Sequence, residues 1–337
     1  MGMIKQFTQK SLSVFRFGKK WLDQLLGSFI EAARTISYVE TVNPHQSDTL
    51  HREMKHSEEI FFKRAFEGSV RKALPLLKLG SVKVAIDVTE DLYWGKNGLH
   101  NTRASSHEHQ IESWQYVNLS IVEPYFIPLM SIPYKMIDSL DDCVIELLEY
   151  LKTLPLKVNV VLFDRGFYHW HLIDYLNGQQ RGWSWPYVIF VPKNEAMKDF
   201  IEQTERGIGK FVHREKYAKN QTMWRTKTKI IVLKGASKNK KGEPIDWCFA
   251  TNQNFNFEIL KIYRKRWNIE TGFRIHDEAR IKSKSANPLI RFFYHLLGML
   301  FILLWRINNH LNKYHEVFKR FLKIVEHSFY ALENAPT

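Results

Sequence analysis

Two aspartates stand at the ends of apolar runs that are typical of buried strands. Asp87 ends the run VAID, and Asp164 ends the run VVLFD. A carboxylate directly after buried aliphatic side chains is costly unless it is paired or binds a metal ion. One acid on each of two neighbouring strands is a way to hold Mg²⁺, which prefers hard oxygen ligands. Glu90 and Asp91 lie close enough in sequence to support Asp87. The alternative is that each aspartate only begins a loop, since aspartate is common there.

A third acid lies on a segment with helical spacing. Tyr263, Arg266 and Glu270 fall at positions i, i+3 and i+7, and Arg274 follows four residues later. At 3.6 residues per turn, these side chains share one helix face. Such a stripe suits a metal ion flanked by phosphates, because an arginine fork binds phosphate oxygens through two parallel hydrogen bonds. A solvated, salt-bridged helix face is the alternative for this stripe taken alone.

Together these segments resemble the motifs of one family. DVTEDLYWG, FDRGFYHW and YRKRWNIETGFR are similar to the three acidic motifs of insertion-sequence transposases of the DDE type, and in particular to the branch with a Tyr-x2-Arg-x3-Glu-x6-Lys signature. The aspartates are 77 positions apart, and Glu270 follows Asp164 by 106 positions. The resemblance covers roughly residues 80–310. It implies an α/β fold of the ribonuclease H-like type, with a mixed sheet flanked by helices and a β-rich insertion before the last acid.

The resemblance also implies a chemistry. Asp87, Asp164 and Glu270 would be the catalytic residues and the ligands of two divalent ions, Mg²⁺ or Mn²⁺. In such a pair, one ion lowers the pKa of the attacking water or 3′-hydroxyl, and the other stabilises the leaving oxygen. The site would nick DNA at the ends of an insertion sequence and then join the 3′-hydroxyl to target DNA. Tyr263 and Arg266 would contact phosphate near the cut.

One position departs from the signature. The lysine would fall at position 277, where this chain has Asp277. Its phosphate contact therefore does not carry over. Arg274, Arg280 or Lys282 could substitute as a DNA contact, and the spacing alone does not choose between them. All three acids are present, so the sequence does not indicate an inactive enzyme.

Several aromatic and histidine residues are weaker candidates. Trp94, Trp224 and Trp247 could stack on an unstacked base, but the chain has 10 tryptophans and each is more often a packing residue. The segments His107–His109 and His169–His171 look like metal ligands. Without a third ligand at metal-binding spacing, loop or surface histidines are the favoured interpretation.

The chain around these residues alternates between helical and strand-like patterns. Residues 1–78 have helical spacing and end at Gly80 and Ser81. Three strand-like runs, a helix, a strand, a helix and a strand follow. They are expected at 82–89, 114–122, 124–136, 139–154, 158–164, 168–182 and 187–194. Residues 195–250 are polar, basic and β-prone, and a long helix is expected from 255 to 282.

These changes divide the chain into five regions. A helical DNA-binding region is followed by the first part of a catalytic core, a basic β-rich insertion, the second part of the core with the Glu270 helix, and a helical tail. The predicted bounds are 1–78, 79–194, 195–250, 251–312 and 313–337.

The charge of the chain favours a polyanionic partner. The 337 residues carry a formal net charge of +14. Residues 193–241 hold +9 and residues 260–291 hold +6, so the rest of the chain is about neutral. A basic footprint this concentrated is typical of nucleic-acid binding. The partners predicted are the terminal inverted repeats and target DNA, with a homodimer in the complex that joins the ends.

Composition excludes several classes of protein. With 45% hydrophobic and 25% charged residues, the chain is an ordinary globular protein rather than a fibrous or disordered one. Cys143 and Cys248 stand alone in apolar segments, which excludes a zinc finger and does not indicate an oxidising compartment. No Walker A or dinucleotide-type glycine loop supports an ATP- or NAD-dependent enzyme.

The longest apolar stretch runs from 289 to 305 but is interrupted by Arg291 and His295. Since a span needs about 20 apolar residues, a buried core helix and no membrane partner are expected. The first residues lack the pattern of a secretory signal. The predicted location is the cytoplasm of a prokaryotic cell, in association with the nucleoid.

Three functions remain open from the sequence. The leading hypothesis is a DNA transposase. A ribonuclease H-like nuclease that cuts without rejoining is the second, and a non-catalytic DNA-binding protein derived from a transposase is the third. The intact acids argue against the third, and the Tyr and Arg face together with the β-rich insertion argues against the second.

Overall fold

The computed structural model describes most of the 337 residues. The described ranges are 2–11, 19–93, 102–105, 112–178, 183–193, 195–204, 210–217, 223–238, 240–254, 258–313 and 315–333.

A mixed sheet of nine strands forms the centre of this part of the chain, in the order β2-β3-β1-β5-β6-β9-β8-β7, with β4 also paired to β3. β1 and β5 are parallel, as are β5 and β6, whereas the other pairs are antiparallel. The strands are β1 (Ser81–Leu92), β2 (Arg103–Ala104), β3 (Glu112–Glu123), β4 (Ile127–Pro133), β5 (Lys157–Phe163), β6 (Tyr187–Phe190), β7 (Lys210–Tyr217), β8 (Met223–Lys238) and β9 (Pro244–Thr251). The predicted mixed sheet flanked by helices is confirmed.

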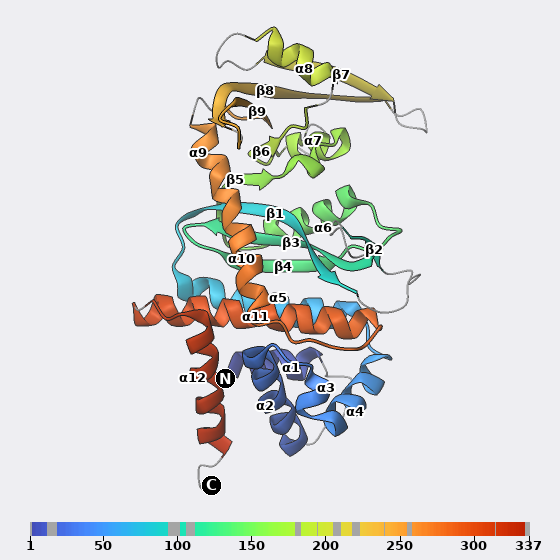
Figure 1. Ribbon diagram of the computed structural model, residues 1–337, viewed down its shortest axis with the longest axis vertical. Helices are drawn as coiled ribbons and strands as arrows, with labels where there is room; N and C mark the ends of the chain where they lie inside the picture. The colour runs from blue at the N-terminus through green and yellow to red at the C-terminus, as the bar shows by residue number, and fades with distance from the viewer. Residues whose placement is uncertain are drawn as a thin grey trace.

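Helices cover this sheet and extend beyond it (Figure 1). They are α1 (Gly2–Ser11), α2 (Lys19–Thr35), α3 (Val39–Val42), α4 (Pro44–Met54), α5 (Glu59–Leu77), α6 (Leu140–Lys152), α7 (Trp170–Asn177), α8 (Glu195–Glu202), α9 (Ile259–Tyr263), α10 (Trp267–Asp277), α11 (Pro288–Asn312) and α12 (Phe318–Glu333), with 3-10 turns η1 (Arg165–Phe167) and η2 (Arg264–Arg266). Capping follows the sequence: the Ser139 hydroxyl accepts a hydrogen bond from the Asp142 amide at 3.4 Å at the start of α6.

The burial of β1 changes along its length. Val82, Val84, Ala85 and Ile86 are fully buried, as the apolar run predicts. From Asp87 to the end of the strand, the residues are only half-buried. Asp87 is therefore the first residue of β1 after the buried apolar run, at the point where the strand leaves the core.

The strands of region 195–250 continue the central sheet. β9 pairs antiparallel with β6 over three residue pairs, and β8 pairs with β9. In Figure 1 these strands lie at one end of the molecule, beyond β5 and β6. They lengthen the sheet, and the domain bounds given above stay predictions.

The prediction of one continuous helix over 255–282 is wrong. α9 passes through η2, where the tighter winding of a 3-10 turn interrupts the α-helix, into α10, which ends at Asp277. Residues 278–287 form a linker between α10 and α11. The backbone of this linker pairs with the N-terminal region, which keeps it from continuing the helix. The Lys282 amide donates to the Ser37 carbonyl at 3.1 Å, and the Val39 amide donates to the Lys282 carbonyl at 3.2 Å.

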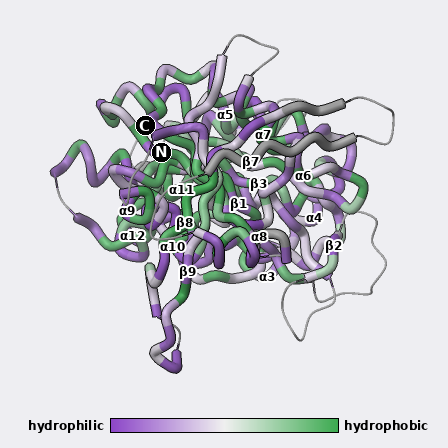
Figure 2. The backbone as a smooth tube through the Cα atoms, turned by 90° about the horizontal axis from the view of Figure 1, so that it is seen from above, coloured by the Kyte–Doolittle hydropathy of each residue, from purple (hydrophilic) through white to green (hydrophobic). Residues whose placement is uncertain are grey.

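α11 is the expected core helix. It packs against α5 and β4, and Figure 2 shows hydrophobic residues gathered along α11 and the central strands. By length and composition this helix could cross a membrane, but 78% of its apolar window is buried inside the protein. Arg291 is accommodated by an ion pair with Asp91. Helices α1 to α4 lie on the side of α11 that faces away from the sheet (Figure 1).

Candidate active site

The two aspartates lie side by side on the sheet, Asp87 within β1 and Asp164 directly after β5. Ile86 of β1 pairs in register with Phe163, the last residue of β5. Asp87 is the next residue of β1, which continues to Leu92, and Asp164 directly follows β5. The register of the two parallel strands therefore brings these two acids together. The pattern of an apolar run ending in aspartate therefore identified a real juxtaposition.

Arg266 joins Asp87 to the third acid. Its Nη1 lies 2.6 Å from Asp87 Oδ2, and its Nη2 lies 2.6 Å from Glu270 Oε1. The Arg266 side chain is only 6% exposed, Asp87 is 17% exposed and Glu270 is 54% exposed. One guanidinium thus bridges an acid on the sheet and an acid on α10.

Tyr263 completes the cluster from α9. Its hydroxyl donates to Asp164 Oδ1 at 3.2 Å, and its ring centroid lies 5.7 Å from the Arg266 guanidinium carbon. The η2 turn keeps the two residues on the same side despite the break in the helix. Arg274, by contrast, is exposed, and its Nη2 donates to Thr271 at 3.2 Å. Among the predicted site residues, it is the one that lies outside the cluster of contacts.

The cluster has unusual electrostatics. Burial raises the pKa of the Asp87 carboxyl to about 6, and the charges of Asp164 and Glu270 act in the same direction, against Arg266 and the Val88 amide. Burial opposes the charge on Arg266, but its tyrosine and carboxylate neighbours raise its pKa above the ordinary value. The acids therefore interact with one another, and Arg266 holds the positive charge among them.

The donor set can be compared with the needs of a divalent ion. Three carboxylates offer the hard oxygen ligands that Mg²⁺ and Mn²⁺ prefer. Within the described residues, no group of three or more His, Cys, Asp or Glu side chains is gathered closely enough to hold one ion, and Arg266 lies between Asp87 and Glu270. The three carboxylates match a divalent ion in donor type but are not gathered around one point, and ligation requires carboxylate oxygens to turn away from Arg266.

Aromatic rings line the cluster on the side of β6 and β9. Trp247 lies 5.4 Å from Phe190 and 6.2 Å from Tyr263 between ring centroids, and its Nε1 donates to Ser237 at 2.7 Å. Trp247 is thus a packing residue that supports Tyr263. Trp267, which directly follows Arg266, is 44% exposed. This tryptophan was not among the predicted site residues, although its place in the motif was a usable signal.

The histidine and remaining tryptophan candidates lie elsewhere. His169 Nδ1 lies 2.8 Å and His171 Nδ1 lies 3.5 Å from the carboxylate of Asp141, so these histidines meet at an acid in the first turn of α6. The residues of 107–109 and Trp94 lie outside the described part of the chain, as does the side chain of Trp224.

Asp277 has a structural partner. Its Oδ1 lies 2.7 Å from Arg280 Nη2, and Arg280 Nη1 also lies 3.3 Å from Asp91. Glu90 binds the Ser105 hydroxyl at 2.8 Å. Arg280 is therefore already engaged by two acids.

Comparison with known proteins gives a family match and a similar fold. Residues 141–305 match the family described as the transposase DDE domain, a range that includes Asp164 and Glu270. Among solved structures, the chain is similar to a piggyBac transposase in a synaptic complex with hairpin DNA, determined by cryo-EM. The TM-score is 0.61 and the identity 11%, over 100% of this chain and 80% of that one. No curated protein matches the chain. The family match over residues 141–305 and the shared fold together support a DDE-type transposase.

Proposed function

We propose that this protein cleaves DNA at the ends of an insertion sequence and transfers the 3′-hydroxyl into target DNA. The convergence of Asp87, Asp164 and Glu270 around Arg266 and Tyr263 carries this proposal. Tyr263, Arg266 and Glu270 also favour the branch with the Tyr-Arg-Glu-Lys signature, with Asp277 as its departure.

Asp87, Asp164 and Glu270 are the residues that would hold two divalent ions, Mg²⁺ or Mn²⁺, which activate the attacking oxygen and stabilise the leaving oxygen when bound. Tyr263 orients Asp164 through its hydroxyl. Asp87 is oriented twice, because its Oδ1 accepts the Val88 amide at 2.9 Å while its Oδ2 faces Arg266. The chain therefore positions each strand acid before any substrate arrives.

Arg266 has a spare donor for DNA. Its Nε is buried and has no hydrogen-bond partner among the described residues. A buried donor without a partner is costly, and a backbone phosphate oxygen near the cut would satisfy it once the side chains that cover the Nε atom move aside. Arg274 lies two turns beyond Arg266 on the exposed face of α10 and would contact phosphate farther along the strand.

The proposed partners are the terminal inverted repeats and target DNA. The net charge of +14 and the hairpin DNA in the complex of the similar piggyBac transposase support this. A homodimer would hold two ends together. We place the protein in the cytoplasm of a prokaryotic cell, in association with the nucleoid.

The test replaces each acid in turn. Asp87→Ala, Asp164→Ala and Glu270→Ala are each expected to abolish nicking of the DNA that flanks the gene, at Mg²⁺ concentrations that support the native protein. Binding of the same fragment should change little, because the basic surface remains. The matched control is Asp48→Ala, an exposed acid on α4 outside the cluster and the linker, which should keep nicking.

The same assay separates the competing functions. A product in which the 3′ end is joined to a second duplex supports transposition, whereas nicking alone supports a ribonuclease H-like nuclease. Binding without either reaction supports a non-catalytic DNA-binding protein. If all three alanine variants nick at native rates, the acids are not ligands and the proposed site is wrong.

A further inference from the structure

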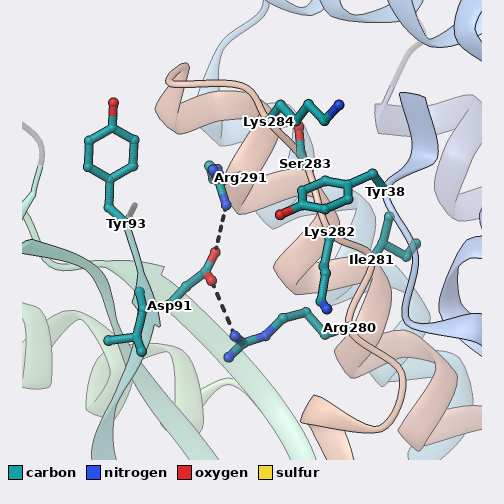
Figure 3. Close-up of a pocket in the computed structure, with 10 residues that line it drawn as sticks. Tyr38, Asp91, Tyr93, Arg280, Ile281, Lys282, Ser283, Lys284 and Arg291 are labelled. Carbon is teal, nitrogen blue, oxygen red and sulfur yellow. Dashed lines mark hydrogen bonds and ion pairs between the residues drawn. The ribbon is translucent and has the colours of Figure 1, made fainter. Parts of the chain in front are cut away.

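A second polar site lies beyond the end of β1. It is a pocket of about 400 Å³ whose walls come from the end of β1 with the residue after it, the linker between α10 and α11, the first turn of α11, and the segment between α2 and α3. Figure 3 shows Asp91 between Arg280 and Arg291, with Tyr93 and Tyr38 on opposite sides. The pocket joins the sheet that carries Asp87 to the N-terminal helical region.

The pocket has an excess of positive charge. One carboxylate, Asp91, is shared by two guanidiniums, at 3.3 Å from Arg280 and 3.4 Å from Arg291. Lys282 and Lys284 also line it. Both lysine side chains are exposed, and neither has a carboxylate within ion-pair distance in the part of the chain that the structure describes. Asp277 also pairs with Arg280, so four cations face two acids, and this remaining positive excess favours an anion as the ligand.

The two lysines are held in place by their backbone. The Val39 amide donates to the Lys282 carbonyl at 3.2 Å, and the Lys284 amide donates to Glu40 Oε1 at 3.0 Å. The Ser283 hydroxyl donates to the same Glu40 oxygen at 2.7 Å. The linker is therefore fixed against α3, and its lysines lose less freedom on binding than lysines on a free loop.

The pocket lies on the same side of the sheet as the acids. Asp87 and Asp91 are four residues apart on β1, and side chains an even number of positions apart point to one face. At about 3.3 Å per residue, they are separated by roughly 13 Å. This equals about four nucleotides of one DNA strand at 3.4 Å each. Arg266 binds Asp87 and Arg280 binds Asp91, so the α9–α10 segment runs between the two sites.

We propose that this pocket binds a backbone phosphate of the DNA whose end lies at the three acids. Lys282 and Lys284 contact the phosphate. Arg280 and Arg291 are held in place by Asp91 and make the electrostatic potential of the pocket more positive. The inference rests on the proposed function, since the acids define where the DNA end lies. The family signature has a lysine at position 277, where this chain has Asp277. In this proposal the linker lysines make the phosphate contact in its place.

The test compares two double variants with the same change in charge. Lys282→Gln/Lys284→Gln alters the pocket. Lys319→Gln/Lys323→Gln alters two exposed lysines of α12, a helix that packs against α2. Binding of a labelled DNA duplex in EDTA is followed by fluorescence anisotropy over a range of salt concentrations. The pocket variant should bind roughly five- to thirtyfold more weakly at 0.15 M salt, and its log K against log salt slope should be shallower by about 1.8.

The outcomes separate this inference from the proposed function. Equal affinities and slopes for the two double variants overturn the pocket proposal, even if the native protein cleaves DNA. A native protein that does not bind the duplex overturns both. If inorganic phosphate raises the melting temperature of the native protein but not of the pocket variant, and the duplex binds both equally, the pocket takes a free phosphate and the DNA assignment is wrong.

Cross-linking measures the position of the contact. Cys143 and Cys248 are both buried, so a Lys284→Cys variant presents an accessible thiol at the pocket. Duplexes that mimic a cut end and carry a thiol-tethered phosphate at successive positions are expected to give the highest disulfide yield about four nucleotides from the end. A yield that does not depend on position overturns the placement.

Discussion

At the scale of single residues, Arg266 organises the candidate site. Its side chain is almost fully buried and faces two acids on different elements. Buried ion pairs lose solvation, and replacing the whole pair with apolar residues is often neutral or stabilising, whereas removing one partner is strongly destabilising. The buried Asp87–Arg266 pair is therefore not explained by a need to stabilise the fold. The position of Arg266 among three carboxylates suits the proposed site, where it balances their negative charge.

The stability of this pair gives a direct prediction. Arg266→Gln should lower the free energy of unfolding by about 3 kcal/mol, because it leaves the Asp87 carboxyl buried beside two other acids. Adding Asp87→Asn should recover a large part of that loss, since the uncompensated charge is then removed. Urea denaturation of the two single variants and the double variant measures the coupling. Strictly additive losses would show that the two side chains do not interact, and Arg274→Gln, at an exposed position, should change stability by less than about 0.5 kcal/mol.

The sequence predicted some residues of the site and not others. Asp87 and Asp164 could be found because the register of two parallel strands aligns residues that end similar apolar runs. Tyr263, Arg266 and Glu270 could be found because an interrupted helix still keeps their common face. The pocket around Lys282 could not be found, because it depends on backbone pairing with Ser37 and Val39, far away in the sequence.

At the scale of elements, α10 must approach the sheet closely to place Glu270. Gly272 permits this approach: a Cβ atom there would lie 2.3 Å from the buried ring of Phe126. That distance is shorter than any normal contact, so a larger residue must push the helix away from β3 and β4. The glycine is needed for packing, because no positive φ is involved.

Gly272→Ala should therefore lower stability by about 1–3 kcal/mol through overpacking, and DNA nicking should fall while duplex binding is largely kept. Gly68→Ala is the matched control on α5, where a Cβ atom would meet only the Lys10 ammonium at 3.6 Å. In that open helical position, alanine should be neutral or stabilising by up to about 1 kcal/mol. Similar effects of the two changes on stability and nicking would contradict the role given to Gly272.

α10 and α11 also meet at two buried histidines. His276 Nε2 lies 3.1 Å from the His295 carbonyl, and His295 Nε2 lies 2.8 Å from the Ser131 hydroxyl and 3.2 Å from Asn118 Oδ1. Burial, followed by the charges of His276 and Arg280, lowers the pKa of His295 well below its usual range. Burial also lowers the pKa of His276 below its usual value. Both imidazoles therefore resist protonation in the folded protein.

This burial predicts a loss of stability in acid. The unfolded chain takes up a proton on each histidine as the pH falls below about 6.5, whereas the folded chain does not. The contribution of the neutral histidines to the free energy of unfolding is therefore fully present above about pH 6.5. Below this pH, each histidine lowers the free energy of unfolding by up to about 1.4 kcal/mol for every pH unit. Urea denaturation at several pH values should show a shallower acid loss for His295→Gln than for the native protein, and parallel curves would contradict the assignment.

At the scale of the whole molecule, the sheet supplies a rigid frame with polar sites along it. β7, β8 and β9 extend one end of this frame, and the N-terminal helices lie toward the other (Figure 1). The order of elements along the chain could be predicted from apolar runs. The sheet order could not, because β9 joins β6 across a region whose composition suggested a separate unit.

This distribution of charge predicts strongly salt-dependent DNA binding. Each phosphate neutralised adds about −0.9 to the slope of log K against log salt, so six or more contacts give a slope steeper than about −5. If DNA spans the frame, both basic segments contribute. Lys238→Gln/Lys240→Gln, at exposed positions near the β8–β9 turn, should then make the slope shallower by about 1.8, as the linker variant does. Titrating a labelled duplex at several salt concentrations measures each slope. If the linker variant changes the slope and Lys238→Gln/Lys240→Gln does not, the DNA lies on the α10 side only. A slope near zero for the native protein would mean that the basic surface does not bind DNA.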